Sequence, residues 1–378
     1  MTTGSVSAES GRRPGNASPP NASPADAPTV PMSTLDTDAN LRRVREVEGY
    51  KVLPPCVLYG RIGQGGMGAV YRGRHLNLDI DVAVKCLKPE LTGDDEQFVV
   101  RFRREARAAA RINHQNVVRV FDVSEAAGLH YIVMELVQGE TARQRVQRKQ
   151  RLAVGEALEI LWGAANGLAE AHGRGFIHRD VKPDNIMISS GGQVKVADLG
   201  LAKPASSSAM SMLSGTNVVM GTPQYMPPEQ WENTATVTPA ADVWALGATL
   251  YYLLVGGEAI AKDSLPRIMQ RIVLQPFPDV REQRPDVPDD IAALIAKATA
   301  RAPEERYADA RELAAAIERL ETRRESLRDV AAVSDGEQET LLSPPPAKTL
   351  ARIKISLGER APADEHEPAP ATAPRPRR

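Results

Sequence analysis

Cysteine is scarce in the 378-residue chain, which contains only Cys56 and Cys86. Two cysteines at this spacing form neither a metal-binding motif nor a disulfide framework, and they fit a reducing compartment. Long apolar runs are missing too, because residues 243–257 contain glycine and fall short of the roughly 20 residues that a membrane span needs. The N-terminus carries no apolar signal core. We therefore expect a cytoplasmic protein that does not span a membrane.

The sequence also lacks an excess of either charge. Its 47 basic and 48 acidic residues leave a formal net charge of −1. Such a balance provides no overall basic field, so we expect no nucleic-acid partner. Hydrophobic residues make up 42% of the chain and charged residues 25%, which are the proportions of a globular protein. The length allows one two-lobed domain or two ordinary domains.

The two ends of the chain show little apolar periodicity. Residues 1–45 are rich in Ser, Pro, Ala and Thr, and residues 333–378 are rich in Pro, Ala, Glu and Arg. These compositions bury too little apolar surface to offset the entropy that ordering costs, so both ends are predicted to be disordered. Residues 352–357 alternate apolar and polar side chains, which indicates either a short edge strand or a mildly apolar patch.

A glycine-rich turn separates two strand-like stretches, residues 57–59 and 69–72. Glycines allow the backbone to close over phosphates and to offer amide donors without a Cβ in the way. The segment after the turn is strand-like rather than helical, which disfavours a dinucleotide-binding fold. The candidate phosphate-binding residues are Ile62, Gly63, Gln64, Gly65, Gly66, Met67, Gly68, Ala69 and Val70.

A β-branched strand and a helix come next. In the strand, residues 82–85, alternation places Ala83 and Lys85 on one face. In the helix, Phe102, Ala109 and neighbouring apolar residues recur on one side, and Glu105 lies in the same stripe. Because a carboxylate in an apolar stripe is costly unless it is paired, we predict an ion pair between Glu105 and Lys85.

The densest group of chemically active side chains lies in the polar loop at residues 177–185. It contains Asp180, Lys182 and Asn185, and its apolar flanks predict a loop held between two short strands. Further strands are predicted at residues 117–123 and 131–136, and residues 194–200 are predicted to be a strand that runs into an acidic turn at Asp198. Helices are predicted at residues 157–172, 240–255 and 309–324.

In this order, the motifs resemble the signature of protein kinases, and we identify the chain as similar to bacterial, Hanks-type serine/threonine kinases. The resemblance covers roughly residues 50–324. It implies a two-lobed α+β kinase fold, with an N-lobe at residues 50–137 and a C-lobe at residues 138–326. It also implies ATP and Mg²⁺ as cofactors and proteins with Ser or Thr acceptors as substrates.

The resemblance assigns roles to individual residues. Asp180 would accept the proton of the substrate hydroxyl, and Lys182 would contact the transferring phosphoryl group and indicate Ser/Thr specificity. Asn185 and Asp198 would bind Mg²⁺. Further implied contacts are adenine with Ala83 and the backbones of Glu135 and Val137, the gatekeeper position at Met134, the catalytic-loop backbone with Asp242, and Glu229 with Arg306.

Two other functions fit part of this pattern. A small-molecule kinase is disfavoured because Lys182 and residues 221–229 serve peptide docking in the family. A nucleotide-binding pseudokinase scaffold that signals through its tails is disfavoured because the five residues required for catalysis are all present, namely Lys85, Glu105, Asp180, Asn185 and Asp198. Phosphorylation-dependent partners acting through the tails or the activation loop are compatible with catalysis.

Thr216, with Ser214 as the second choice, is predicted to be autophosphorylated in the Ser-rich segment at residues 206–222. Arg179 would pair with the new phosphate and order this segment. A double variant with Thr216→Ala and Ser214→Ala should lose activity by about tenfold or more, the scale of a lost charge-assisted hydrogen bond. Phosphate transfer to a protein substrate measures the effect, and full activity of the double variant would refute the hypothesis.

Overall fold

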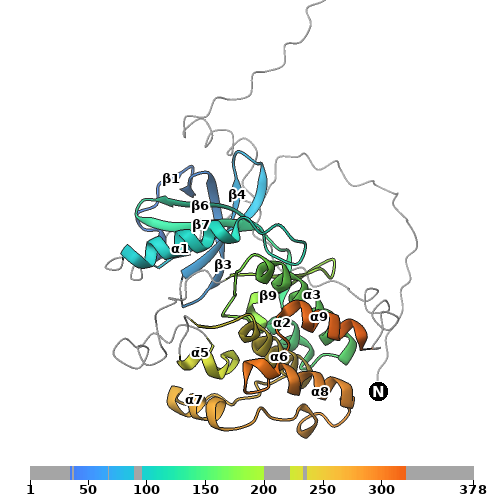
Figure 1. Cartoon of the computed structure of the whole chain (residues 1–378). Helices are drawn as coiled ribbons and strands as arrows, with labels where there is room; N and C mark the ends of the chain where they lie inside the picture. The colour runs from blue at the N-terminus through green and yellow to red at the C-terminus, as the bar shows by residue number, and fades with distance from the viewer. Residues whose placement is uncertain are drawn as a thin grey trace, which may run out of the picture.

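The structure is a computed structural model that describes residues 35, 38–66, 68–88, 96–199, 222–232 and 236–320. It consists of a strand-rich lobe above a mostly helical lobe (Figure 1). The upper lobe holds the glycine-rich turn and the strand of Lys85, and the lower lobe holds the loop of Asp180. The two-lobed α+β fold is therefore confirmed.

The upper lobe is built on a seven-stranded antiparallel sheet with the strand order β1-β2-β3-β4-β5-β7-β6. Alternation along β5 places Val82, Val84 and Cys86 in the core on one face of this sheet, and Ala83 and Lys85 on the other. The strands are β1 (Glu46–Val47), β2 (Tyr50–Leu53), β3 (Cys56–Gln64), β4 (Gly68–His75), β5 (Ile80–Leu87), β6 (Val120–Ala126) and β7 (Leu129–Glu135).

Each face of this sheet has its own cover. Helix α1 (Glu96–Ala109) lies across the front face in Figure 1, where Phe102 packs into the same core as Ile132 of β7. The opposite face is covered by the N-terminal residues around the 3-10 turn η1 (Ala39–Leu41).

This N-terminal cover corrects the disordered tail predicted for residues 1–45, because its last part is packed. Leu35, Leu41 and Val44 are at most 4% exposed and join the core with Tyr71. Residues 1–34 lie outside the described residues, as does the C-terminal tail with the predicted strand at 352–357. Periodicity cannot reveal so short a segment, but burying one such side chain contributes about 1.5–3 kcal/mol, which helps to offset the ordering cost.

The lower lobe surrounds one buried helix, α6 (Ala240–Val255), as predicted from its apolar sequence. Helices α3, α8 and α9 pack against it. The other helices are α2 (Ala142–Lys149), α3 (Val154–Gly173), α5 (Pro228–Glu232), α7 (Leu265–Leu274), α8 (Asp289–Ala298) and α9 (Ala310–Arg319). Helix α3 thus begins three residues before its predicted start, and Asp309 caps α9 by accepting from the amide of Glu312 at 2.9 Å.

A small antiparallel sheet of order β10-β9-β8 lies at the top of the lower lobe. Its strands are β8 (Gly139–Thr141), β9 (Ile186–Ser189) and β10 (Val194–Val196). Asn116 joins β10 to the upper lobe, because its Nδ2 donates to the carbonyl of Val194 at 2.7 Å and its carbonyl accepts from the amide of Val196 at 2.8 Å. Val117 pairs with Val196 only as an isolated bridge, so β6 starts three residues after its predicted start.

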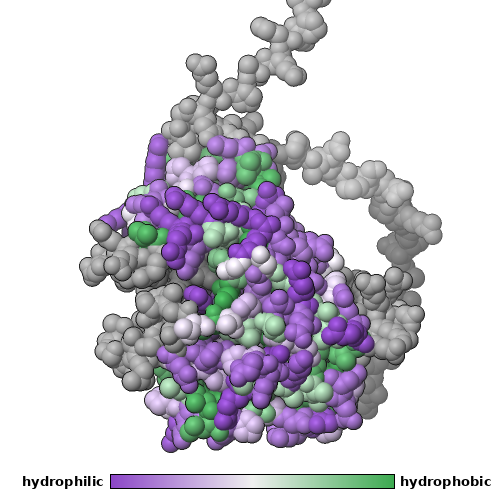
Figure 2. Space-filling view, in the orientation of Figure 1, coloured by the Kyte–Doolittle hydropathy of each residue, from purple (hydrophilic) through white to green (hydrophobic). Residues whose placement is uncertain are grey.

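Figure 2 shows a surface on which hydrophilic residues predominate and hydrophobic residues form scattered areas. Within the described residues, none of the helices is long and apolar enough to cross a membrane.

Gly167 in α3 should be required by packing, because a Cβ on it would lie 2.3 Å from the carbonyl oxygen of Asn116. We predict that Gly167→Ala lowers the free energy of unfolding by about 1–3 kcal/mol, the usual cost of overpacking. Gly173→Ala in the same helix is the matched control, since its Cβ would meet only Arg311 at 3.6 Å. Urea denaturation of both variants measures the difference, and equal stabilities would contradict the prediction.

Candidate active site

The polar loop is held by one buried carboxylate from helix α6. Asp242 accepts the backbone amides of His178 and Arg179, each at 2.8 Å. This support replaces one of the two flanking strands that the sequence predicted, because residues 174–182 form no strand and only β9 follows the loop. Arg179 has φ of +63°, a conformation that a non-glycine residue holds only when its surroundings enforce it.

Asp242 also accepts from His172 of α3, whose Nε2 lies 2.9 Å from its Oδ2. The Nδ1 of His172 accepts the amide of Ala310 at 3.2 Å, so the ring proton lies on Nε2 and points at the carboxylate. Burial alone would raise the pKa of Asp242, but the interactions with His172 and His178 outweigh it and lower that pKa. Asp242 is therefore held as a carboxylate at the centre of the lobe.

Asp180, Lys182 and Asn185 converge within this loop. The Nζ of Lys182 lies 2.9 Å from the Oδ2 of Asp180. Asn185, in the 3-10 turn η3 (Pro183–Asn185), donates its Nδ2 to the carbonyl of Asp180 at 2.8 Å and to its Oδ2 at 3.2 Å. The three residues named from the sequence are thus joined into one polar cluster, with the Asp180 carboxylate 17% exposed.

Asp198 is positioned beside this cluster by β10. The residue before it, Ala197, donates its amide to the carbonyl of Asn185 at 2.8 Å and accepts from the Nε2 of His178 at 2.9 Å. Asp198 itself has φ of +60°. Its carboxylate reaches across to the upper lobe, where it lies 2.7 Å from the Nζ of Lys85.

The ion pair between Lys85 and Asp198 was not predicted from the sequence. Asp198 is 113 positions away from Lys85 in the sequence and is brought near it only by the fold. Glu105 lies half-buried on α1, and its pairing with Lys85 stays a prediction.

Apolar residues from both lobes gather next to Lys85. Ala83, Val118 and Met134 form a small buried cluster, and further residues pack against it. Met134 is the register partner of Ala83 across β5 and β7. The residues packed against the cluster are Val70, Leu136, Val137 and Ala197.

The segment that connects the lobes is anchored by Glu135. Its amide donates to the carbonyl of Arg119 at 2.8 Å. Its carboxylate lies 3.1 Å from the Nζ of Lys195 of β10. The adenine contacts assigned to Glu135 and Val137 stay predictions.

The glycine-rich turn contains glycines of two kinds. Gly68 is required by the fold, because a Cβ on it would lie 1.9 Å from the carbonyl oxygen of Cys86. Gly65 and Gly66 have no atom within 4 Å of a Cβ and no positive φ, so neither packing nor strain within the described residues demands glycine there. Met67 lies outside the described residues.

Arg143 is a member of the site that the sequence did not reveal. Its guanidinium lies 2.8 Å from Asp184 in the polar loop and 3.0 Å from Glu258, and it donates to the hydroxyl of Tyr225 at 3.3 Å. Five basic residues follow one another closely in and around α2, and their spacing gives no sign of which one faces the loop.

The pair of Arg306 with Glu229 was predicted from the family resemblance. Arg306 donates to both carboxylate oxygens of Glu229, at 2.7 and 2.8 Å, and so forms a bidentate ion pair.

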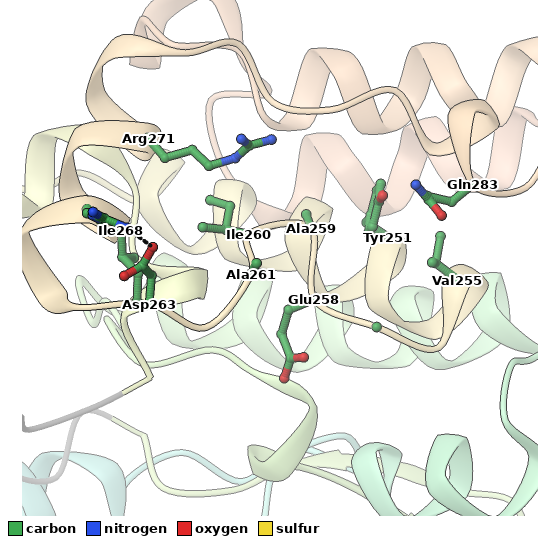
Figure 3. Close-up of a pocket in the computed structure, with 12 residues that line it drawn as sticks. Tyr251, Val255, Glu258, Ala259, Ile260, Ala261, Asp263, Ile268, Arg271 and Gln283 are labelled. Atoms are coloured by element: carbon green, nitrogen blue, oxygen red, sulfur yellow. Dashed lines mark hydrogen bonds and ion pairs between the residues drawn. The ribbon is translucent and has the colours of Figure 1, made fainter.

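A groove of about 460 Å³ lies elsewhere in the lower lobe, between the end of α6 and α7. Figure 3 shows Tyr251 and Gln283 at one end of it and Asp263 and Ile268 at the other. Glu258 on its wall is the residue that Arg143 binds. None of the residues that line the groove belongs to the cluster around Asp180.

Comparison with known proteins decides the family. A family model of the protein kinase domain matches residues 57–316. The chain belongs to the protein kinase family. Members of this family use ATP and usually a divalent metal, and the cluster of Lys85, Asp180, Asn185 and Asp198 lies in the matched region.

Similar proteins are bacterial serine/threonine kinases. The chain is 37% identical to the serine/threonine-protein kinase PknL of Mycobacterium tuberculosis over 264 residues, 70% of this chain and 65% of PknL. It is 40% identical to PknB of Mycolicibacterium smegmatis over 292 residues, 76% of this chain and 46% of PknB. The matches thus span between about half and two thirds of these relatives. The crystal structure of the Mycobacterium tuberculosis PknI kinase domain is similar at a TM-score of 0.56 and 29% identity, covering 71% of this chain and 97% of that one.

Asp242→Asn should destabilise this kinase domain by roughly 3–5 kcal/mol at pH 7, the usual cost of breaking a buried charged network. Because the folded-state pKa of Asp242 lies below its unfolded value of about 3.9, its contribution is complete above that value and is lost as the pH falls through the folded-state pKa. The stability difference between wild type and Asp242→Asn should therefore shrink below about pH 4. Urea denaturation across pH 3–7 tests this, and a difference that is independent of pH would contradict it.

Proposed function

We propose that the protein transfers the γ-phosphoryl group of ATP to serine and threonine hydroxyls of other proteins. The observation that carries the proposal is the convergence of Asp180, Lys182 and Asn185 in one hydrogen-bonded cluster beside Asp198. Phosphoryl transfer requires the protein mainly to position reacting groups and to neutralise charge. This cluster offers Asp180 as a carboxylate base and Lys182 as a cation, and Lys85 adds a second cation beside Asp198. The names of the bacterial relatives support the Ser/Thr class.

Asp180 is the proposed base. It is partly exposed, so a substrate hydroxyl can reach it, and Lys182 and Asn185 fix its Oδ2 from two sides. The carboxylate would orient the hydroxyl and take its proton. The ammonium of Lys182 lies beside this base. Lys182 would therefore move its contact from Asp180 to the transferring phosphoryl group when the substrates bind.

Mg²⁺ is the metal that fits the two oxygen-bearing side chains here. Among the described residues, both hydrogen bonds of the Asn185 side chain use Nδ2, so its Oδ1 is available as a ligand, and Asp198 adds a carboxylate. Mg²⁺ in such sites is held by one or two protein oxygens together with substrate phosphates. When bound, it would neutralise charge on the β- and γ-phosphates.

ATP fits the remaining features of the site. The apolar cluster of Ala83, Val118 and Met134 suits a flat adenine ring. Gly65 and Gly66 leave room above it for phosphates, which the amide of Gly66 could bind. The amide of Gly65 donates to the carbonyl of Gly68 at 2.8 Å and so shapes the turn. Lys85 would exchange its contact with Asp198 for one with a phosphate oxygen.

Regulation by autophosphorylation is part of the proposal. Thr216 and Ser214 lie outside the described residues, so support for them comes from the sequence and from Arg179, whose strained backbone fixes it next to Asp180. Partners that recognise the phosphorylated loop or tails would follow from the same chemistry. Both cysteines are free and buried, which supports a location of the protein in the reducing cytoplasm.

Asp180→Asn tests the proposal, because the amide keeps the shape of the side chain but cannot take a proton. Phosphate transfer from labelled ATP to a generic protein substrate should fall on the order of 10²–10⁴-fold. Asp286→Asn, an exposed carboxylate outside the site, is the matched control and should retain full activity. Phosphoamino-acid analysis should recover phosphoserine and phosphothreonine. A wild-type protein that binds ATP but transfers no phosphate would refute the proposal and favour a nucleotide-binding scaffold.

A further inference from the structure

The side chain of Asp38 joins the N-terminal cover to the two strands that carry the glycine-rich turn. The family match begins at residue 57, so Asp38 lies outside the part shared with the kinase family model. Its carboxylate is nevertheless only 4% exposed. A carboxylate that is buried so deeply in the upper lobe needs hydrogen-bond partners. Those partners show which segments of the lobe Asp38 connects.

The two carboxylate oxygens of Asp38 serve two different parts of the lobe. Oδ1 accepts the backbone amide and the Nδ2 of Asn40, at 3.0 and 3.1 Å, and so closes the turn η1 of the N-terminal cover. Oδ2 accepts the hydroxyl of Tyr71 at 2.8 Å and a guanidinium N–H of Arg61 at 3.4 Å. One side chain thus fastens the N-terminal cover to β3 and β4.

Arg61 and Tyr71 occupy a particular place in the sheet. They are register partners across β3 and β4, and they form the last pair before the register shifts between Arg61 and Gly63. Beyond that irregularity the chain enters the glycine-rich turn, where Ile62 is 49% exposed. Asp38 therefore joins both strands just before the register shift, two residue pairs (Gly63 with Val70 and Gln64 with Ala69) from the end of the strands at the turn.

The hydrogen bond from Tyr71 to Asp38 is buried and charge-assisted. The phenol is buried, and burial together with the hydrogen bond to Asp38 raises the pKa of Tyr71. The hydroxyl consequently stays protonated at neutral pH and always donates. A charge-assisted hydrogen bond of this kind, shielded from water, is stronger than a neutral one on the surface.

Apolar packing around this hydrogen bond also connects the N-terminal cover to the strands of the turn. Leu35, Leu41 and Val44 cover the face of the sheet to which Tyr71 and Ala69 contribute. Ala69 pairs with Gln64 where β3 and β4 end at the turn. Within the turn, the amide of Gly65 donates to the carbonyl of Gly68 at 2.8 Å, and no protein atom lies within 4 Å of a Cβ at Gly65 or Gly66. The strands at its base therefore set the position of the turn relative to the sheet.

From this geometry we propose that Asp38 is a positioning residue for nucleotide binding. It fixes the base of the glycine-rich turn, so that the backbone amides of the turn are held where ATP phosphates bind. The N-terminal cover is then a working part of the nucleotide site rather than a mere extension. This inference rests on the proposed kinase function and names a residue that acts through Arg61 and Tyr71 without touching the substrate.

Asp38→Ala in the full-length chain tests the inference. We expect the KM for ATP to rise about tenfold, the scale of a lost charge-assisted hydrogen bond, while kcat and the KM for the protein substrate change less than about twofold. Tyr71→Phe, which removes one donor and leaves Arg61, should raise the KM for ATP by a smaller factor. Asp38→Asn keeps one carbonyl acceptor and should lie between Asp38→Ala and wild type.

Glu46→Gln is the matched control. Glu46 belongs to the same N-terminal segment and pairs with Lys51 at 2.8 Å, but this ion pair joins β1 to β2 and includes no residue of β3 or β4. It should leave the KM for ATP unchanged. A purely structural role for Asp38 predicts instead a lower melting temperature with an unaltered KM for ATP, and that outcome would overturn the inference.

Direct binding separates this inference from the proposed function. The Kd for ATP is measured by calorimetry on each variant, without any need for turnover. A wild-type protein that binds ATP and transfers phosphate, beside an Asp38→Ala variant with the same Kd, would refute the role of Asp38 alone. A wild-type protein that binds ATP but transfers nothing would refute the proposed function, while a weaker Kd for Asp38→Ala would still support the positioning role. If Asp38→Ala does not fold, the graded effect of Tyr71→Phe and Asp38→Asn on Kd decides the question.

Discussion

The Asp242 carboxylate is buried at the centre of the lower lobe, where it binds two consecutive backbone amides of the catalytic loop and the ring of His172. Arg179 in this loop has a positive φ, and the hydrogen bond from its amide to Asp242 stabilises that conformation. Helix α6, which carries Asp242, is enclosed by the rest of the lobe. The position of Asp180 is thus determined by the packing of the whole domain rather than by its own loop. This arrangement explains why so polar a sequence as residues 177–185 adopts one conformation.

The proposed nucleotide site is shared between the two lobes. Lys85 from the upper sheet meets Asp198 from the lower lobe, and Asn116 ties β10 to the upper lobe nearby. The glycine-rich turn closes the same region from above and takes its position from the strands below it. A change in how the lobes meet would therefore move Lys85, Asp198 and the turn relative to one another. In this account, binding of ATP and metal depends on one shared geometry.

Much of this could be predicted from the sequence where the information is local. Asp180, Lys182 and Asn185 lie within six positions, and the alternation along β5 placed Ala83 and Lys85 on one face correctly. Partners brought together by the fold could not be predicted in this way. The contact of Lys85 with Asp198 depends on tertiary distances, and so does the contact of Arg143 with Asp184. The N-terminal cover was missed because its few apolar residues have no periodicity and acquire a partner only when the sheet exists.

The most direct test of a shared nucleotide and metal site is the Mg²⁺ dependence of ATP binding. Calorimetry would compare the Kd for ATP in Mg²⁺ and in EDTA, for wild type and for Asp198→Asn, with adenosine as the control ligand. The account predicts that Mg²⁺ tightens ATP binding in wild type and has little effect in Asp198→Asn, and that adenosine binds both proteins alike. An ATP affinity in wild type that is the same with and without Mg²⁺, or an undiminished Mg²⁺ effect in Asp198→Asn, would contradict it.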